Sequence, residues 1–270
     1  MHQLAQIIGS RVIPAFYWNK LRAATSTPAT QNPLRERCMI TLFSYPELYG
    51  LEDNNPYGLK VFAFLKLCGL PFEHRHILDT QSAPRGQLPY LTDDQESIGD
   101  SDAIIAYLKR TVGLDIDDAL TPIQHDLSFL IRRTLDDLYW VMSYSRWSDP
   151  RFWPVFKDAF LSAHSGITAD SLDAARQYNF ERYRYQGIGR FEPSEVYARG
   201  IADLQVISNL LGDKEFLFGA QPTSIDASVY GFVANIFFYD IDTPLKQFVL
   251  TRPELVRHCR AVRAAIAKPG

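Results

Sequence analysis

The chain has 270 residues, a net charge of -3 at pH 7 and a pI near 6.1. This length suits two domains of ordinary size, and 46% hydrophobic residues with 13% aromatic residues are typical of a globular chain. The balanced charge does not favour a nucleic-acid partner, because such partners usually require a concentrated basic face. The sequence contains no apolar run of about 18 residues, so no membrane span is predicted. Three widely spaced cysteines form neither a disulfide framework nor a zinc motif, so we expect a cytoplasmic protein without a metal.

The first 38 residues differ in composition from the rest and are interpreted as an N-terminal extension. Apolar residues recur at helical spacing between Leu4 and Phe16, and a linker-like stretch follows over 25–33. The segment is basic, with Glu36 as its one acid. A transit peptide, or a surface helix on a membrane or partner, would fit this composition. We favour the simpler interpretation, an extension before a functional start at Met39, so membrane contact through residues 1–37 is the less favoured alternative.

Residues 39–112 predict a small α/β domain. The elements expected in chain order are a strand over 39–45, a helix over 57–68, a strand over 72–78, a short connector over 81–86, a hairpin with strands 90–92 and 96–98, and a helix over 101–110. A parallel β-α-β unit requires a right-handed crossover, and the hairpin adds an antiparallel pair. This is the order of elements in a thioredoxin-like domain.

The remainder of the chain predicts helices alone. Residues 113–122 contain the acidic run DIDDALTP and are interpreted as a solvated interdomain linker; the spacing of Asp115, Asp117 and Asp118 lacks the glycine and final glutamate of a calcium loop. An all-helical domain is expected over 123–270. Its predicted helices are 123–145, 151–163, 168–184, 193–211, 223–237 and 252–267.

Leu88-Pro89 is the first candidate for ligand binding. Proline cannot donate to a sheet ladder, so it is tolerated at the first residue of a strand, in a tight turn and in some cases with a cis peptide bond. Such a turn would leave the N–H and C=O groups of Leu88 available to the backbone of a ligand. An ordinary proline between loop and strand is the competing interpretation.

Asp100-Ser101 is the second candidate, eleven residues after Pro89. Ser101 lies where a helix begins, so free backbone N–H groups and its hydroxyl can bind an anion, and Asp100 can accept from an ammonium group. Together they suit the head of an amino acid that carries both charges. Simple N-capping is the alternative. In the derived order of elements, Pro89 and the Asp-Ser pair would lie side by side.

These two motifs in this order of elements resemble the glutathione transferases. The resemblance implies a domain of order β-α-β-α-β-β-α followed by an all-α domain. It also implies that Leu88 precedes a cis-proline and pairs with the glutathione backbone, that Asp100 and Ser101 hold the γ-glutamyl group, and that Gln87 reaches the glycyl end. A homodimer is implied as well.

The helical region adds a second resemblance. Thr223 and Asp226 are spaced as a capping box, similar to the buried capping motif of glutathione-transferase C-terminal domains, where the role is structural. Further runs are similar to the failed-axon-connections and metaxin-like branch: Tyr185 to Arg190 (YQGIGR), Phe216 to Gly219 (FLFG) and Pro244-Leu245. Gly187 to Arg190 lacks the preceding strand of a phosphate loop, so it is interpreted as a helix break with a fixed arginine contact.

The residue that would activate the glutathione thiol is left open between three candidates. The thiolate is the nucleophile, and the family commonly has Ser or Cys before the proline that begins the first helix. This chain has Asn55 there, which can donate a hydrogen bond but cannot form a mixed disulfide; that argues against a thioltransferase of the omega type. Tyr45 and Tyr57 are the rival hydroxyl donors. Lys60 either attracts the thiolate or is a solvated helix residue.

An electrophile pocket is expected along the first helix of the helical domain, with Tyr139, Trp140 and Tyr144 as lining or core residues. Asp136-Asp137 and Arg132-Arg133 are interpreted as solvated surface. His74 and His76 share a strand face without a third metal ligand, so no metal site is predicted.

Two hypotheses therefore remain. The favoured one is a detoxifying, cytoplasmic transferase with glutathione as substrate, a hydrophobic electrophile as second substrate and no metal. The alternative is a non-catalytic binding or structural protein of the same fold.

Overall fold

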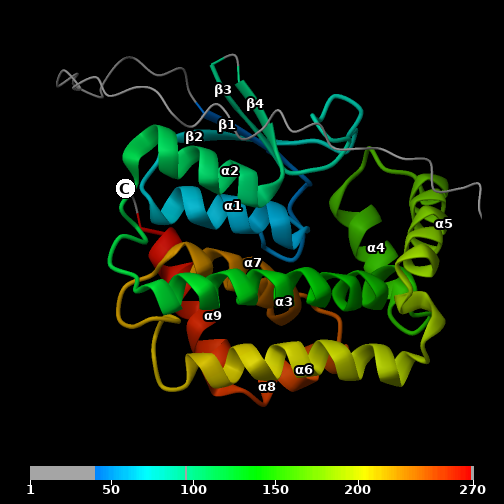
Figure 1. Ribbon diagram of the computed structural model, residues 1–270. Helices are drawn as coiled ribbons and strands as arrows, with labels where there is room; N and C mark the ends of the chain where they lie inside the picture. Colours follow the sequence, from blue (N-terminus) through cyan, green and yellow to red (C-terminus); the bar gives the residue numbers. More distant parts are fainter. Residues whose placement is uncertain (1–39, 95, 269–270) are drawn as a thin grey trace, which may run out of the picture. The chain divides into compact units, whose positions relative to one another are not determined.

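The computed structural model describes residues 40–94 and 96–268, so the predicted N-terminal extension over 1–38 lies outside the described residues. A four-stranded mixed sheet begins the described chain (Figure 1). Its strands are β1 (Ile40–Ser44), β2 (Phe72–His76), β3 (Tyr90–Asp93) and β4 (Glu96–Gly99), arranged β2-β1-β3-β4. The β1–β2 pair is parallel, and the β1–β3 and β3–β4 pairs are antiparallel. The predicted parallel β-α-β unit and the predicted hairpin are both confirmed.

The connector before β3 differs from the order of elements that the resemblance implies. Residues 77–89 form turns instead of a helix. Pro84 interrupts the segment, Gly86 has a φ of 63°, and backbone hydrogen bonds close two successive turns, from Ala83 N–H to the Thr80 carbonyl and from Gly86 N–H to the Ala83 carbonyl. The six residues of the expected connector, 81–86, are too few to form a stable helix, and Pro84 and Gly86 lie among them. This extended loop carries part of the candidate site.

Two helices accompany the sheet. Helix α1 (Pro56–Leu67) connects β1 to β2, and α2 (Ser101–Leu108), followed by the π-helical turn η2 (Lys109–Gly113), comes after β4. Both lie between the sheet and the helical domain in Figure 1. Residues Val61 to Leu65 of α1 are all buried, because α1 packs against β1 on one side and against α7 on the other.

The helical domain contains the predicted helices with small shifts of their ends. They are α3 (Pro122–Trp147), α4 (Trp153–Ala163), α5 (Ala169–Gln186), α6 (Pro193–Leu211), α7 (Ser224–Phe237) and α9 (Pro253–Ile266). The structure adds η3 (Ile188–Arg190) and the short helix α8 (Pro244–Leu250), which begins at the Pro244-Leu245 pair. Gly187 ends α5 with a φ of 109°, and Arg190 Nε donates to the Arg184 carbonyl at 3.1 Å. This confirms the predicted helix break and arginine contact.

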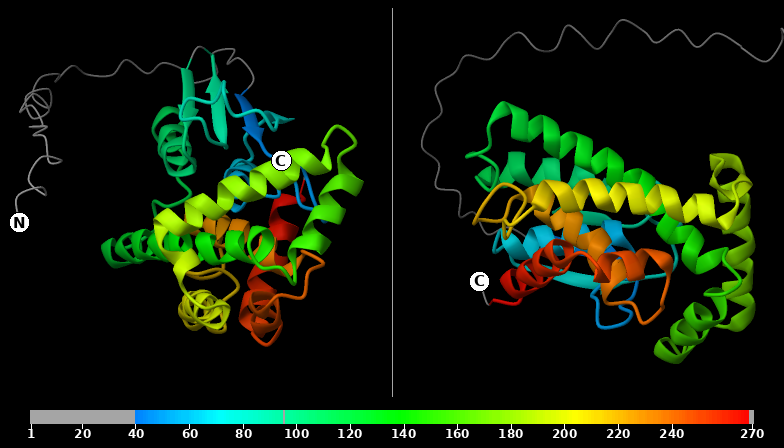
Figure 2. Two further views of the ribbon diagram at one scale, coloured as in Figure 1. Left: turned by 90° about the vertical axis from the view of Figure 1, so that its right-hand side faces the viewer. Right: turned by 90° about the horizontal axis from the view of Figure 1, so that it is seen from below.

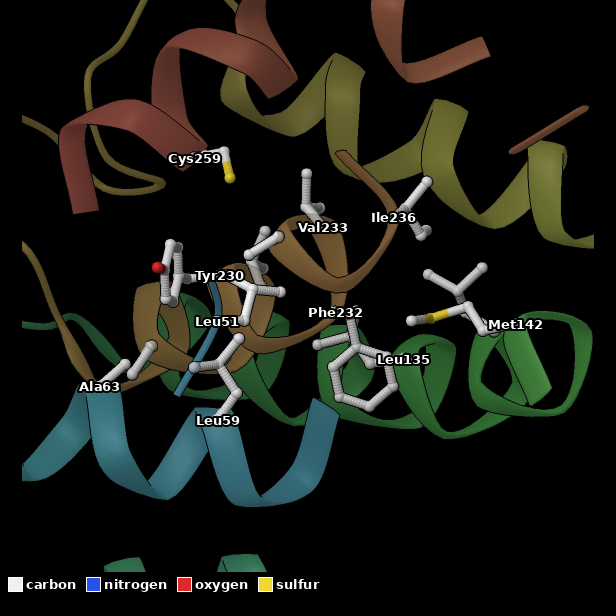
Figure 3. Packing of buried hydrophobic residues seen from close by; sticks show 14 of the residues in the cluster. Leu51, Leu59, Ala63, Leu135, Met142, Tyr230, Phe232, Val233, Ile236 and Cys259 are labelled. Carbon is white, nitrogen blue, oxygen red and sulfur yellow. The ribbon is translucent and has the colours of Figure 1, made fainter. Parts of the chain in front are cut away.

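Helix α7 is the centre of the core. Figure 3 shows its side chains Tyr230, Phe232, Val233 and Ile236 among residues of α1, α3 and α9. All its residues from Ser224 to Ile236 are buried. At Gly231 the backbone of α1 comes so close that an added Cβ would lie 2.5 Å from the Pro56 carbonyl oxygen. The two domains therefore share one continuous hydrophobic core.

The start of α7 is held by the predicted capping box. Asp226 is fully buried and accepts from Thr223 N–H and Thr223 Oγ1, both at 2.8 Å, and from Leu217 N–H at 2.8 Å. His258 Nε2 of α9 lies 3.0 Å from the same carboxylate. These contacts join the loop before α7 to the last helix, which agrees with the structural role expected for this motif.

The prediction that the acidic linker is solvated is wrong for Asp117. Asp117 is buried and accepts from Ser224 N–H at 2.8 Å and from Ser224 Oγ, and Lys109 Nζ lies 2.7 Å from it. These donors lower the pKa of the Asp117 carboxyl against the opposing effect of its burial, which is the largest single influence. The acidic run in the sequence does not by itself show that Asp117 accepts from the first residue of α7, a helix about 100 residues further along the chain.

Among the described residues, no helix is both long enough and apolar enough to cross a membrane.

Candidate functional site

Two adjoining cavities lie between the α/β domain and helices α3 and α5. The cradle cavity, of about 620 Å³, is lined by Leu88, Pro89, Asp100 and Ser101 among others. The apolar cavity, of about 560 Å³, extends between α3, α4 and α5. Six residues line both cavities and thus mark their junction: Tyr45, Asn55, Thr80, Tyr139, Tyr178 and Arg182. A ligand in one cavity can therefore meet a ligand in the other at this junction.

Leu88 and Pro89 form one edge of the cradle cavity. The peptide bond between them is cis, and Pro89 immediately precedes β3. Within the described part of the chain, neither the N–H nor the C=O group of Leu88 takes part in a backbone hydrogen bond. This edge can pair with the backbone of a peptide-like ligand, in the manner of an added strand. Gln87, Gly86 and Arg85 continue the same wall and are exposed.

The start of α2 forms the adjacent wall. Asp100 is the N-cap: its Oδ1 accepts from the N–H groups of Asp102 and Ala103, both at 3.0 Å. Its φ of 84° is rare for a residue with a side chain, and such backbone strain is concentrated at functional sites. Capping occupies one carboxylate oxygen and leaves the other available to an ammonium group. The N-capping interpretation and the ligand interpretation are therefore compatible here.

Lys60 lies behind Ser101. Of the two predicted alternatives for Lys60, the solvated surface position is therefore wrong. Lys60 is 3% exposed; its Nζ donates to Ser101 Oγ at 3.1 Å and forms an ion pair with Asp102. Burial is the main influence on Lys60 and lowers its pKa, against the opposing effect of Asp102. Because the ammonium group donates to Ser101 Oγ, the hydroxyl hydrogen of Ser101 remains free to donate into the cavity.

Asn55 and Tyr45, two of the three candidate sulfur donors, are both at the junction. Asn55 is the N-cap of α1, and its Oδ1 accepts from Tyr57 N–H at 3.0 Å. This assigns the carboxamide oxygen to the helix and leaves the NH₂ group available as a donor. Burial raises the pKa of Tyr45 to about 12, so its hydroxyl stays protonated and can donate.

Tyr57, the third candidate, has its hydroxyl committed elsewhere. It donates to Asp136 Oδ1 of α3 at 3.0 Å. Burial, and then the Asp136 carboxylate, raise the pKa of this phenol far above its usual range. A hydroxyl has one hydrogen to donate, and that of Tyr57 is used by Asp136. In this arrangement Tyr57 therefore links α1 to α3. Asp136, predicted to be solvated surface, accordingly lines the cradle cavity.

A buried arginine of α3, Arg146, holds the loop that carries Asn55. Arg146 of α3 donates to the Asn54 carbonyl at 3.0 Å and to the Asn235 carbonyl of α7, and its guanidinium lies 3.9 Å from the centre of the Tyr239 ring. Tyr239 also donates to the Asn54 carbonyl, at 2.9 Å. The position of the loop that carries Asn55 thus depends on side chains of the helical domain.

The apolar cavity only partly follows the prediction for the electrophile pocket. Tyr139 lines it and the junction, Trp140 lines the cradle cavity instead, and Tyr144 is buried against Tyr183 and Tyr197. Successive residues of one helix face different directions, which accounts for the division. Helices α4 and α5 lie at one end of α3 (Figure 2). These two helices and the loop between them complete the lining of the cavity with the apolar residues Phe156, Phe160, Ile167, Leu172 and Ala175.

The described residues that line the cradle cavity without having been predicted from the sequence include Thr80, Arg85, Tyr178 and Arg182. The first two belong to the irregular loop before β3. Tyr178 and Arg182 lie on α5 about ninety residues away from the cradle, and their i,i+4 spacing is ordinary for a helix surface. No local pattern distinguishes them, because their position depends on how α5 packs against the rest.

His74 and His76 lie together on β2, with ring centres 4.3 Å apart, and His74 Nε2 is 2.7 Å from Ser44 Oγ. Burial lowers the pKa of His74 to about 4, with a smaller contribution from His76. Over residues 40–94 and 96–268, no group of three or more His, Cys, Asp or Glu side chains is placed to hold a metal ion.

Comparison with known proteins assigns the chain. The family descriptions "Glutathione S-transferase N-terminal domain" and "Glutathione S-transferase, C-terminal domain" match residues 56–152 and 200–262. Isoprene-epoxide–glutathione S-transferase of Rhodococcus sp. (strain AD45) is 32% identical over 83% of this chain and 98% of its own. Failed axon connections of Drosophila melanogaster is 26% identical over 83% of this chain and 57% of its own, and metaxins match at lower identity.

A solved glutathione S-transferase of Ceriporiopsis subvermispora in complex with glutathione shares the fold, with a TM-score of 0.56 and 17% identity over 86% of this chain and 99% of that one. The predicted α/β thioredoxin-like domain with an all-helical domain behind it is confirmed, as is the resemblance to the failed-axon-connections and metaxin-like branch. The chain belongs to the glutathione S-transferase superfamily.

Proposed function

We propose that this protein binds glutathione in the cradle cavity and transfers its thiol to a hydrophobic electrophile in the apolar cavity, as a cytoplasmic detoxifying enzyme. The observation that carries the proposal is the shared junction. The edge at Leu88 and the start of α2 lie on one side and have the chemistry to bind a peptide backbone and an anion. The apolar cavity lies on the other side, with the candidate sulfur donors Asn55 and Tyr45 between them. Two substrates held at this junction would gain the rate advantage of proximity.

The chemistry of the cradle suits the parts of glutathione. Asp100 would accept from the α-ammonium group, and Ser101 with the N–H groups at the start of α2 would bind the α-carboxylate. Leu88 would pair with the cysteinyl backbone, and Gln87 or Arg85 would reach the glycyl end. The thiol would then lie near Asn55 and Tyr45. The bacterial relative is named for an epoxide, so epoxides are the first electrophiles to test.

The test is a titration with glutathione while thiolate absorbance is followed, and then assays with chlorodinitrobenzene and with styrene oxide. Saturable binding, a thiolate band near neutral pH and turnover of at least one electrophile are expected. Binding without turnover of either compound would leave only the non-catalytic alternative. Absence of binding would remove both.

Two variants identify the sulfur donor. We propose that Asn55 and Tyr45 share this task, so Asn55→Ala and Tyr45→Phe should each raise the pKa of bound glutathione, with glutathione affinity changed much less. If only one of them moves the thiolate titration, that residue alone is the donor. If neither does, the partial positive charge of the α1 N-terminus becomes the main source of thiolate stabilisation.

The alternative is a non-catalytic glutathione-binding or structural protein. It is favoured by Asn55 in place of the family's usual Ser or Cys, and by the relation to Failed axon connections and the metaxins. Its version with membrane contact through residues 1–37 is tested by sedimentation with liposomes, comparing the full-length chain with a form that begins at Met39. Equal absence of binding by both would remove it.

We also propose a homodimer. Ile123, Phe129 and Leu130 near the start of α3 are large apolar residues that are 71%, 48% and 58% exposed, and a second copy would cover them. Leu130→Glu should shift the protein to a monomer in analytical ultracentrifugation, whereas Val206→Glu, at an apolar exposed position of α6, should not. A monomeric wild type at micromolar concentration would contradict the proposal.

A further inference from the structure

Arg182 is placed at the junction and has no acidic partner among residues 40–94 and 96–268. It lies on α5, is half-buried, and lines both the cradle cavity and the apolar cavity. Its Nη1 donates to Asn179 Oδ1 at 3.0 Å, and its guanidinium lies 5.1 Å from the centre of the Trp140 ring. Within the described residues, no carboxylate lies within 4 Å of this guanidinium. Only part of its hydrogen-bonding capacity is used, since a guanidinium has five N–H donors.

Three phenols line the same junction as this cation. Tyr45, Tyr139 and Tyr178 line the same two cavities, and all three hydroxyls lie close enough to interact electrostatically with one another or with Arg182. These hydroxyls can also donate hydrogen bonds. The result is a group of donors with a net positive charge at the place where the two substrates would meet. Such a group suits negative charge that develops during a reaction.

We propose that Arg182 stabilises the oxyanion formed when the thiolate attacks an electrophile whose reacting group contains oxygen, epoxides above all. The inference rests on the proposed function and adds to it the electrophile class and the residue that selects it. In the step, a bond forms between the glutathione sulfur and an epoxide carbon while the carbon–oxygen bond breaks, and its electron pair goes to the oxygen. The alkoxide then takes a proton, which balances the one released when the thiol ionised. Arg182 donates N–H bonds throughout and remains protonated.

The position of Arg182 distinguishes it from the other cations near the cavities. Arg146 also lines the apolar cavity, but its guanidinium is engaged with the Asn54 and Asn235 carbonyls and the Tyr239 ring. Arg85, beside Gln87, lines the cradle cavity but not the apolar cavity. A glycyl carboxylate would meet Arg85 without leaving the cradle, whereas Arg182 reaches into the apolar cavity. The arginine at the junction is therefore better placed for the electrophile.

The test compares two electrophiles in one set of variants. Opening of styrene oxide places charge on oxygen; displacement of chloride from 4-nitrobenzyl chloride does not. Arg182→Met should lower kcat/KM for styrene oxide about 100-fold, in the range found when one oxyanion donor is removed, and change kcat/KM for 4-nitrobenzyl chloride less than about threefold. Arg182→Lys should recover part of the loss. Arg184→Met, an exposed residue of the same helix outside both cavities, is the control that removes the same charge and should match the wild type.

Each other outcome is informative. Equal losses for the two electrophiles would overturn the oxyanion role and leave the proposed function standing. A glutathione Kd raised tenfold or more by Arg182→Met, with the ratio between electrophiles unchanged, would assign Arg182 to the peptide substrate and likewise overturn the inference. A wild type that binds glutathione but converts neither electrophile would refute the proposed function, and the inference with it.

Discussion

The two walls of the cleft are built on different principles. The wall from the α/β domain presents backbone groups, at Leu88 and at the start of α2, with Asp100 and Ser101 beside them. The wall from α3 and α5 presents side chains, namely Tyr139, Trp140, Tyr178 and Arg182. Backbone groups are fixed by local geometry and tolerate substitution of neighbouring side chains, whereas a wall of side chains changes with each substitution.

This difference suggests a division of roles. A shared substrate would bind on the backbone wall, which keeps its shape, and variable electrophiles would bind on the side-chain wall. Contacts between the two domains hold the walls in place; they include the close approach of α1 and α7 at Gly231, the hydrogen bond from Tyr57 to Asp136, and the hydrogen bond from Arg146 to the Asn54 carbonyl. Substitutions in either wall, or at these contacts, can therefore show whether the division holds.

The largest effect is expected at Gly231. A methyl group there would meet the backbone of α1 at Pro56 and Lys60, which cannot yield as a flexible side chain could. Gly231→Ala should lower the free energy of unfolding by about 3 kcal/mol, although alanine normally favours a helix over glycine. Urea denaturation measures this. Gly166→Ala, where an added Cβ meets nothing within 4 Å, is the control and should be close to neutral. A Gly231 variant as stable as the wild type would mean that the two domains can separate there at little cost.

Ser101→Ala should produce the next largest effect, on the backbone wall alone. Removal of a hydroxyl that donates to a carboxylate costs about 1.5 to 3 kcal/mol, which corresponds to roughly a 10- to 100-fold rise in the glutathione Kd. Isothermal titration calorimetry gives the Kd, and KM for the electrophile should be almost unchanged. Ser97→Ala on β4, exposed and outside the cavities, is the matched control. If KM for the electrophile rose as much as the glutathione Kd, the division between the walls would be lost.

The same difference explains what the sequence could predict. The Leu88-Pro89 and Asp100-Ser101 motifs lie at element boundaries, where proline and capping chemistry act within a few residues. Their side-by-side placement required only the order of strands. The capping box of α7 was equally accessible, since Thr223 and Asp226 are three residues apart.

The side-chain wall could not be predicted in this way. Arg182 belongs to a mostly polar helix whose orientation depends on contacts with α3 and α4, and nothing near it in sequence indicates a cavity. The sequence predicts a solvated Asp117, because charged residues usually are solvated, and leaves Lys60 open between two positions. Each is buried in the structure and pairs with a residue far along the chain, Asp117 with Ser224 and Lys60 with Asp102. Pairings across 40 to 110 residues arise from tertiary packing, which local patterns do not contain.

Tyr57→Phe should have a smaller effect, at the contact between the walls. Its hydroxyl donates to Asp136, so its removal should lower the free energy of unfolding by about 1 kcal/mol. The pKa of bound glutathione should stay as in the wild type, because the Tyr57 hydroxyl donates to Asp136 in this arrangement. Chemical denaturation and thiolate absorbance measure the two quantities. A raised thiol pKa in Tyr57→Phe would return Tyr57 to the sulfur donors and show that its hydroxyl turns when glutathione binds.

The smallest effect concerns His74, on the sheet behind the backbone wall. Burial lowers its pKa to about 4 in the folded protein, below the ordinary value of 6.5 that applies to the unfolded chain. Below that ordinary value the unfolded chain binds a proton that the folded protein refuses, so stability falls as the pH falls from about 6.5 towards 4. Between about pH 7.5 and about pH 6, His74 should account for less than about 1 kcal/mol of this loss. His74→Gln should remove this contribution. Urea denaturation at the two pH values should then show a smaller difference in the free energy of unfolding for the variant than for the wild type. His76→Gln, at the exposed neighbour, is the control. An unchanged difference in His74→Gln would show that water reaches the ring and that this face of the sheet is less closed than the packing of His74 against Phe62 and Ser44 indicates.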